Sequence, residues 1–311
     1  QTCALPISNR VKLMRDAFVK TLLIEAKKDP NIILITGDLG FGVLEEFQRE
    51  LPNQFINSGV NEQTMMGMAA GIASTGKRVF VYSIANFPTL RCIEQIRNDV
   101  SLMNNPVVIV SVGAGYSYGS QGYTHHALED IAILRALPNI QVLVPADPFE
   151  TQEITKLLVQ SNKPSYFRLG KSNEEIIHQT APRIENRKFI KIRTGKDGSI
   201  LATGSVLKLA LQAAELLAKS GSEVNVYSVP FVSNLDLEEL NKISFDTDQL
   251  IRSLCQKFTQ EQKMELLEVM PTDDFYSSGI FMALVGNTND LVVDAIRNSR
   301  LKRLQIGRAH V

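Results

Sequence analysis

The sequence predicts an α/β protein in which a doubly wound, mainly parallel sheet is followed by a second, smaller α/β unit. Two observations support this prediction. Short apolar runs typical of buried strands alternate with stretches of helical apolar spacing, and polar, turn-rich segments follow several of the runs. Strands covered by helices on both faces read as continuous Val, Ile and Leu, as these runs do. At 311 residues the chain is long enough for two such units.

The first unit is expected over residues 10–171. Its strands are predicted from apolar runs at residues 32–36, 78–84, 107–112, 141–145 and 165–169. Helices are predicted between them at residues 13–28, 58–76, 88–103, 128–137 and 148–160. The helix within 58–76 has no polar face, so we expect it to be buried all round.

A polar stretch without a clear period, residues 172–195, is expected to be a linker. The second unit should span residues 196–305, with strands at 199–204 and 223–230 and helices at 206–220 and 235–243. Beyond Ser244 the pattern degrades, so elements are only weakly placed there.

The two ends of the chain look foreign. Residues 1–7 can be back-translated as the DNA sequence CAGACGTGTGCTCTTCCGATC. The reverse complement of this DNA sequence, read in a shifted frame, encodes residues 306–311. That string resembles a sequencing-library adapter, so both ends are excluded from the fold prediction. We expect the native chain to differ at both ends, with Met14 as a plausible start.

The composition is that of an ordinary globular protein, with 44% hydrophobic residues, 21% charged residues and zero formal net charge. It lacks the basic excess of a nucleic-acid-binding protein. No apolar run approaches the roughly 20 residues that a membrane span needs. Three cysteines without regular spacing argue against a disulfide framework and favour a reducing cytoplasm.

Glu62 stands at the start of the apolar helix, directly after Asn61. One interpretation is structural: Asn61 caps the helix and Glu62 favours its positive end, which stabilises by about 0.3–1 kcal/mol. The other is functional: a carboxylate at the edge of an apolar pocket hydrogen-bonds a buried heterocycle, and desolvation strengthens that bond. The sequence around Glu62 alone leaves both open.

Three further loops after predicted strands carry candidate side chains. Asp38 lies in a turn-rich segment, Phe87 follows another strand, and Arg168 and Lys171 end a third. Each also has a purely structural interpretation. Asp38 could form an Asx-turn, Phe87 could be a core aromatic, and Arg168 and Lys171 could be solvent-facing cations. An arginine can also clamp an anionic substrate through two hydrogen bonds.

A glycine-rich loop ends in His125 and His126. Histidine can relay protons near neutral pH, although a solvent-facing capping segment would look similar. No third ligand lies at a standard metal spacing, so no metal site is expected here. All the candidates follow strands, at the edge of a parallel sheet where ligands bind, and this shared placement favours a single site.

Two segments resemble the transketolase family of thiamine-diphosphate enzymes, which includes 1-deoxyxylulose-5-phosphate synthase and the β subunits of 2-oxoacid dehydrogenases. "GVNEQTMMGMAAGIA" is similar to the segment that carries the family's cofactor-activating glutamate. "GYTHHALEDIAILRALPNIQVLVPAD" is similar to the Gly-Pro-Thr-His helix and following strand, with Tyr123 in place of Pro. The resemblance covers roughly Arg10 to Leu240. It implies a pyrimidine-binding domain followed by the transketolase C-terminal domain.

The resemblance implies a role for each candidate. Glu62 would hydrogen-bond N1′ of the aminopyrimidine, Phe87 would stack on that ring, and Asp38 would lie beside the thiazolium. His125 would contact the reacting substrate oxygen, and Arg168 would bind the substrate phosphate.

Departures from the family pattern imply a partner. The Gly-Asp-Gly motif with a downstream Asn, which holds Mg²⁺ and the diphosphate, is absent, so a second subunit should supply it. Gln121 replaces a sugar-reading aspartate and Ala114 lies in the region of a second histidine, which puts preference for a typical pentulose phosphate in doubt. Residues 244–286 lack the expected Glu-Glu-His and Gly-Gly-x-Gly, through either a local frameshift or genuine divergence.

We therefore expect a cytoplasmic subunit of a split transketolase, which transfers a two-carbon ketol unit between sugar phosphates or related carbohydrates. Glu62 and His125 are its expected catalytic residues, and Gln121 joins His125 and Arg168 at the substrate. The partner would be the N-terminal subunit, in a dimer or heterotetramer. Two alternatives stay open, a β subunit of a 2-oxoacid dehydrogenase-type decarboxylase and a non-catalytic α/β binding module.

Overall fold

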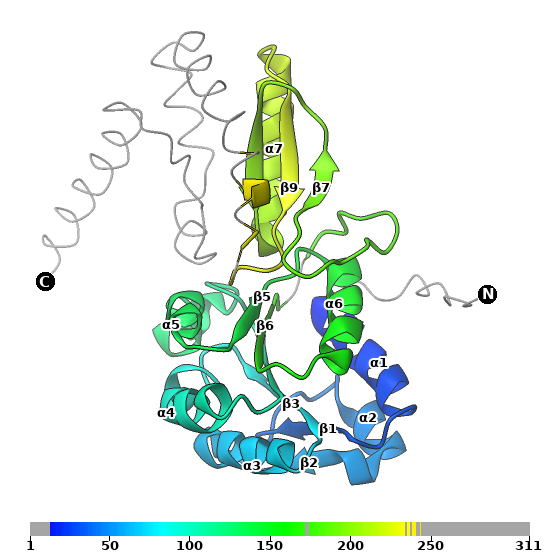
Figure 1. Ribbon diagram of the computed structural model, residues 1–311, viewed down its shortest axis with the longest axis vertical. Helices are drawn as coiled ribbons and strands as arrows, with labels where there is room; N and C mark the ends of the chain where they lie inside the picture. The colour runs from blue at the N-terminus through cyan, green and yellow to red at the C-terminus, as the bar shows by residue number, and fades with distance from the viewer. Residues whose placement is uncertain (1–12, 172–173, 234, 237, 241–242, 244–311) are drawn as a thin grey trace, which may run out of the picture.

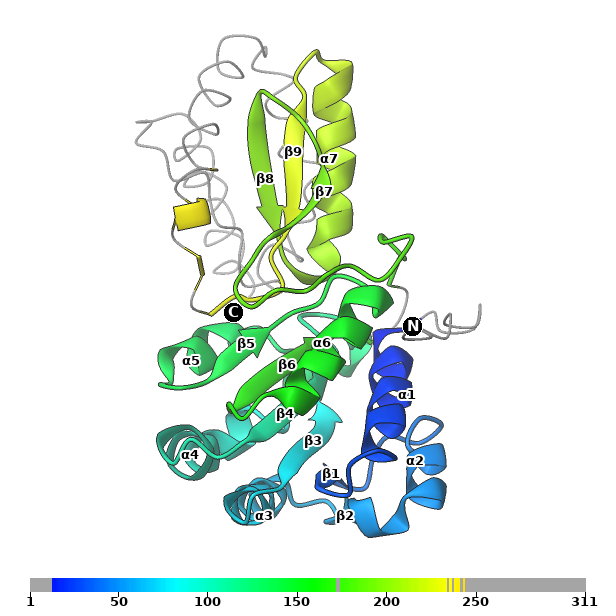
Figure 2. The same cartoon turned by 45° about the vertical axis from the view of Figure 1, so that its right-hand side comes forward.

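A six-stranded parallel sheet with helices on both faces forms the first unit, and a smaller three-stranded sheet lies beyond it (Figures 1 and 2). The computed structural model describes residues 13–171, 174–233, 235–236, 238–240 and 243. The adapter-like ends and the atypical residues 244–286 lie outside this part of the chain. No helix within these ranges is long and apolar enough to cross a membrane.

The strands of the first sheet follow the order β2-β1-β3-β4-β6-β5, and every neighbouring pair is parallel. The strands are β1 (Ile32–Thr36), β2 (Phe55–Asn57), β3 (Arg78–Ile84), β4 (Val107–Val112), β5 (Gln141–Leu143) and β6 (Ser165–Leu169). The predicted bounds of β1, β3, β4 and β6 are confirmed. β2 was not predicted because it is a partly exposed edge strand of three residues, too short for an apolar run.

Helices cover both faces of this sheet (Figure 2). One layer contains α1 (Met14–Ala26), α2 (Glu45–Glu50) and α6 (Pro148–Gln160), and the other contains α3 (Glu62–Ser74), α4 (Ile93–Gln95) and α5 (Asp130–Ala136). Successive strand residues point to opposite faces, so Leu34 and Phe80 join the core beneath α1. Their neighbours Ile35 and Val81 join the core beneath α3.

The helix expected over residues 88–103 is not one regular α-helix. It consists of a 3₁₀ turn (Leu90–Cys92), the short α4 and a π-helical stretch (Ile96–Leu102). Apolar spacing predicted a helical segment correctly, but spacing does not distinguish these hydrogen-bond patterns.

The second unit contains β7 (Ile190–Arg193), β8 (Gly198–Ala202), α7 (Leu207–Lys219) and β9 (Val224–Ser228). β9 pairs parallel with β8 and antiparallel with β7, and α7 packs on β8 and β9 through Ala210, Ala214 and Val226. β7 lies within the stretch expected to be a linker. Its two isoleucines alternate with Lys191 and Arg193, and most of the strand is half-buried. The segment therefore contains no apolar run that would predict a strand.

The chain returns from β9 to the first sheet. Val144 donates a backbone hydrogen bond to Pro230 at 2.8 Å, and Val232 donates to Val142 at 3.0 Å. These bonds cover the edge strand β5, which would otherwise expose unpaired backbone groups.

His178 links the segment between the two units to two buried carboxylates, Asp147 at the N-cap of α6 and Glu150 in its first turn. His178 Nδ1 lies 3.0 Å from Asp147 Oδ2, and His178 Nε2 lies 3.6 Å from Glu150 Oε1. Burial alone would lower the pKa of His178, but the two carboxylates outweigh burial and raise the pKa above 6.5. Burial also raises the pKa of Glu150 to about 7.

We expect this attachment to weaken as the pH rises. Because the folded-state pKa of His178 is raised, its contribution to stability is full below about pH 6.5 and is lost as the pH passes the raised value. The melting temperature should therefore fall by about 2–4 °C more between pH 6 and pH 9 in the unaltered protein than in His178→Gln. His126→Gln, in which the lost ring contacts a carbonyl and a tyrosine, is the control. An equal fall in melting temperature between pH 6 and pH 9 in all three proteins would contradict the prediction.

Candidate functional site

The segments that carry the candidate residues meet at the carboxyl edge of the parallel sheet. The loop after β3 bonds the loop after β4 through Asn86 Nδ2, which donates to the Thr124 carbonyl at 3.1 Å. The loop after β1 bonds the end of β2, because the Asp38 backbone N–H donates to Asn57 Oδ1 at 3.0 Å. These contacts confirm the expected shared placement of the loops.

Glu62 is the first residue of α3 and its side chain is 8% exposed. Asn61 caps the helix, since its side chain accepts a hydrogen bond from the Thr64 N–H at 3.2 Å. Met65 and Met66 are fully buried behind Glu62. The capping interpretation is therefore confirmed for Asn61, and the functional interpretation of Glu62 stays a prediction.

The expectation that α3 is buried all round is wrong for the described chain. One face packs on the sheet, and the opposite face is exposed or half-buried. The residues of that outer face are Gln63, Thr64, Gly67, Met68, Gly71 and Ser74. The middle of this face consists of Gly67, Met68 and Gly71, which carry no charge or hydrogen-bonding side chain, so hydrophobicity did not reveal it.

Glu62, Phe87 and His125 belong to one continuous row of side chains. Arg91 joins the first two, since its Nη1 lies 3.2 Å from Glu62 Oε1 and its guanidinium carbon lies 4.0 Å from the Phe87 ring centroid. The His125 ring follows, 5.1 Å from Phe87 and 5.7 Å from Tyr118 between ring centroids. Arg91 and Tyr118 were not predicted from the sequence. The four-residue spacing of Phe87 and Arg91 was the available signal for the former.

The structure distinguishes the two adjacent histidines. His126 Nε2 lies 3.0 Å from the carbonyl oxygen of Gly119, to which it must donate, and its ring packs edge-on against Tyr116. Among the residues that the structure describes, the His125 side chain bonds only its neighbour Thr124, through Nδ1 at 3.0 Å. Nε2 of His125 therefore keeps its hydrogen-bonding capacity, which a group that exchanges protons with a substrate needs.

Asp38 and Gln121 lie at the rim of this edge. Asp38 is exposed with a positive φ of 57°, and its Oδ1 accepts a hydrogen bond from Asn57 Nδ2 at 3.1 Å. Asparagine and aspartate tolerate this left-handed conformation better than other non-glycine residues. Gln121 is also exposed, in a 3₁₀ turn of the loop after β4. Neither side chain contacts the row that runs from Glu62 to His125 in the described hydrogen bonds and ring contacts.

Arg168 is a buried residue of β6. Its side chain is 3% exposed, and its Nε lies 2.7 Å from Oδ2 of the equally buried Asp130. Arg168 Nη2 also donates to the Ala127 carbonyl at 2.9 Å, and Tyr166 donates its hydroxyl to Asp130 at 2.5 Å. The guanidinium of Arg168 thus belongs to a buried network that ties β6 to the loop carrying His125, and its role at the substrate stays a prediction.

Lys171 is the basic residue at the accessible end of the row. It is half-buried, and its Nζ lies 4.2 Å from the Tyr118 ring centroid. A lysine over an aromatic face keeps its charge and its donors available on the other side. Tyr118 is itself held in place by close packing against Gly113, where an added Cβ would lie 2.1 Å from the tyrosine ring.

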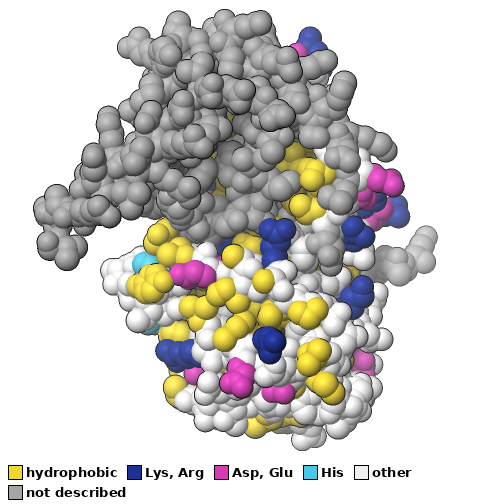
Figure 3. Space-filling view, turned by 60° about the vertical axis from the view of Figure 1, so that its left-hand side comes forward, with side chains coloured by type: hydrophobic (Ala, Val, Ile, Leu, Met, Phe, Trp, Pro, Cys, Tyr) yellow, Lys and Arg dark blue, Asp and Glu magenta, His cyan; other side chains and the backbone are white. Residues whose placement is uncertain are grey.

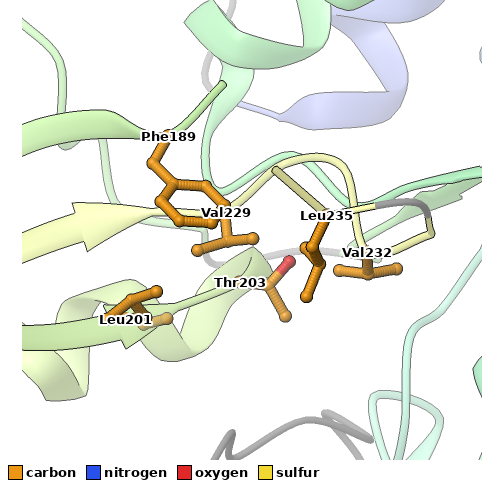
Figure 4. Close-up of a pocket in the computed structure, with 7 residues that line it drawn as sticks. Phe189, Leu201, Thr203, Val229, Val232 and Leu235 are labelled. Atoms are coloured by element: carbon orange, nitrogen blue, oxygen red, sulfur yellow. The ribbon is translucent and has the colours of Figure 1, made fainter. Parts of the chain in front are cut away.

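Two cavities in the described chain lie away from Glu62 and His125. One of about 160 Å³ between the units is lined in part by Tyr116, Ser117, Arg168 and Ser205. The other, of about 20 Å³, lies among the apolar side chains of the second unit, including Phe189, Leu201 and Val229 (Figure 4). It is a packing gap too small for an organic ligand. No group of three or more His, Cys, Asp or Glu side chains in the described ranges could hold a metal ion.

Comparison with known proteins follows the same division of the chain. The family described as "Transketolase, pyrimidine binding domain" matches residues 11–175, and "Transketolase, C-terminal domain" matches residues 188–252. An apulose-4-phosphate transketolase subunit of Phocaeicola vulgatus is 34% identical over 79% of this chain and 79% of its own length. A 6-deoxy-6-sulfo-D-fructose transketolase subunit of a Clostridium species is 30% identical over 76% of this chain and 74% of its own. The solved structure "Split gene transketolase, inactive beta4 tetramer" superposes with a TM-score of 0.70 at 29% identity, covering 80% of this chain and 86% of that one.

Proposed function

Because the chain belongs to the transketolase family, we propose that it is the pyrimidine-binding subunit of a split transketolase, which transfers a two-carbon ketol unit between carbohydrates. The observation that carries the proposal is the row at the sheet edge, where a buried carboxylate, an aromatic ring and a histidine succeed one another as Glu62, Phe87 and His125. A non-catalytic binding module would have no need for this combination.

The residues of the row fit the aminopyrimidine half of thiamine diphosphate. Oε2 of Glu62 has no hydrogen-bond partner among the described residues, so it can bond a ring nitrogen in a largely buried setting. Phe87 is half-buried and can stack on a planar ring. When bound, the cofactor supplies the carbon that carries the two-carbon unit. We propose that Asp38, at the rim, faces the thiazolium.

His125 serves the substrate in this proposal. Its Nε2 would exchange a proton with the oxygen of the transferred unit, while Thr124 holds Nδ1 and the rings of Phe87 and Tyr118 fix the imidazole plane. Gln121 is exposed on the same loop, and we propose that it contacts the carbohydrate hydroxyls. An amide can donate and accept hydrogen bonds, as hydroxyl recognition requires.

A partner subunit would hold the diphosphate and Mg²⁺, because this chain lacks the Gly-Asp-Gly motif. Two large apolar side chains at the sheet edge support this docking: Phe41 is 80% exposed and Val60 is 75% exposed. They lie on the loops after β1 and β2, which approach each other closely at Gly37 and Gly59. Exposed apolar groups beside an incomplete site favour coverage by another protein. A cytoplasmic location, suggested by the cysteine usage, completes this proposal.

Self-association would bury the outer face of α3. Gly67 and Gly71 leave room for a close helix neighbour, since an added Cβ at either position would meet nothing within 4 Å. The molecular face that carries α3, α4 and α5 shows hydrophobic side chains between scattered charges (Figure 3). Leu102 and Met103, at the end of the π-helical stretch, are 68% and 67% exposed. The tetramer named for the similar solved structure supports the same proposal.

Lys171, rather than Arg168, is the residue we assign to an anionic group of the substrate. Lys171→Ala should raise KM for a phosphorylated acceptor about tenfold, through loss of one charge-assisted hydrogen bond, and leave kcat within about twofold. Lys163→Ala, which removes an exposed lysine at the opposite edge of the sheet, is the control. An unchanged KM in Lys171→Ala would contradict the assignment.

The function is tested by producing the chain with and without the product of a neighbouring gene that encodes the Gly-Asp-Gly motif. Calorimetric titration with thiamine diphosphate and Mg²⁺ should give binding only for the assembled complex, and that complex should transfer two carbons from a ketose phosphate to an aldose phosphate. Release of CO₂ from a 2-oxoacid instead would favour the decarboxylase alternative. A complex that neither binds the cofactor nor turns over either substrate would leave the binding-module alternative.

A further inference from the structure

Arg91 contacts both residues that the proposed function assigns to the aminopyrimidine. Its Nη1 donates to Glu62 Oε1 at 3.2 Å, and its guanidinium lies over the face of Phe87 at 4.0 Å. The side chain of Arg91 is 50% exposed, whereas that of Glu62 is 8% exposed. Arg91 therefore reaches from the surface of the molecule to the buried carboxylate.

The local backbone holds Arg91 in this place. Phe87 and Arg91 lie four residues apart at a tight turn that leads into the 3₁₀ helix Leu90–Cys92, and such spacing brings side chains to one side of a helical turn. Thr89 fixes the turn by donating its hydroxyl to the Ala85 carbonyl at 3.0 Å. Cys92 is fully buried next to Arg91, and its Sγ lies 3.7 Å from the Phe87 carbonyl oxygen. Little freedom remains in the backbone that presents the arginine.

A buried carboxylate needs a partner for at least part of its charge, because desolvation without compensation is costly. Arg91 supplies that partner at Oε1 and leaves Oε2 without a partner in the described chain. The same guanidinium stacks on Phe87, and a cation over an aromatic face favours one orientation of both groups. One side chain thus fixes the position of a hydrogen-bonding oxygen and of a stacking ring.

We propose that Arg91 is a positioning residue for the cofactor site, which holds Glu62 and Phe87 in their binding geometry before the aminopyrimidine arrives. The inference rests on the proposed function and adds to it a residue that does the orienting. Prearranged groups bind more tightly because less ordering has to occur during binding. Arg91 acts through Glu62 and Phe87, so its loss should weaken binding without unfolding the chain.

The test uses the assembled complex and thiamine diphosphate with saturating Mg²⁺, titrated by calorimetry. Arg91→Met should raise the dissociation constant of the cofactor about tenfold, a value that allows for the half-exposed state of the arginine. Arg91→Lys should recover part of the loss, since it keeps the charge but not the planar stack. Arg97→Met removes an exposed arginine on the adjoining helical stretch and should bind the cofactor like the unaltered complex.

A double-mutant cycle separates positioning from a general structural effect. In a Glu62→Gln background, Arg91→Met should raise the dissociation constant by a smaller factor than in the unaltered background, because the carboxylate that Arg91 orients is gone and only the contact with Phe87 is left. Tighter binding by Arg91→Met alone would mean that Arg91 competes with the cofactor, and equal binding would mean that it has no role; either result overturns the inference. If the unaltered complex does not bind thiamine diphosphate at all, the proposed function itself fails.

Discussion

Replacing Glu62 with alanine is expected to abolish two-carbon transfer by the assembled complex. Glu62 is the buried carboxylate of the row, and no other acidic side chain contacts Phe87 or His125 in the described part of the chain. Groups that move or hold a proton in this way contribute about 10²–10⁴-fold to the rate. Glu62→Gln, which retains shape but cannot be ionised, should lower kcat by a factor in that range at saturating cofactor.

The fold should survive both substitutions. Removing a buried carboxylate relieves its desolvation, and the freed Arg91 is half-exposed and can turn toward water. We therefore expect far-ultraviolet circular dichroism and partner binding to match those of the unaltered chain. Glu46→Gln, an exposed glutamate on α2, is the matched control and should leave kcat unchanged. Undiminished transfer by Glu62→Ala would remove Glu62 from the mechanism.

Arg168→Met is expected to have the largest effect on stability, a loss of about 3–5 kcal/mol in the free energy of unfolding. The substitution leaves Asp130 buried at 2% exposure without its ion-pair partner. Burial opposes the charge of Arg168, but the neighbouring Asp130 outweighs burial and raises the pKa of the guanidinium. Urea unfolding followed by circular dichroism measures the loss.

Two further variants show whether the effect comes from the buried charge. Arg168→Met combined with Asp130→Leu should recover much of the lost stability, because neither charge is then buried alone. Lys28→Met breaks an exposed pair with Glu25 and should cost less than about 1 kcal/mol. If Arg168→Met kept full stability and instead raised KM for a sugar phosphate, Arg168 would be the substrate anchor first expected from the sequence.

The pairing of Arg168 with Asp130 could not be predicted from the sequence. The position of Arg168 at the end of a parallel strand was predicted correctly, but position alone does not say whether a cation is free or paired. Asp130, its partner, is 38 residues away along the chain. The same limit applies to Arg91 and Glu62, which are 29 residues apart. Long-range pairs of this kind leave no periodic pattern, so only the packing of the elements brings them together.

The sequence by itself determined the strands β1, β3, β4 and β6, because each is a largely apolar run that is buried on both faces of the sheet. It also placed Glu62, Phe87 and His125 at one sheet edge, since parallel strands present their carboxyl ends together. Only the tertiary structure decided that α3 has an outer face and that Arg168 is buried with Asp130 while Lys171 is accessible. Burial and charge pairing depend on which surfaces meet, and the hydrophobicity of a segment does not specify its neighbours.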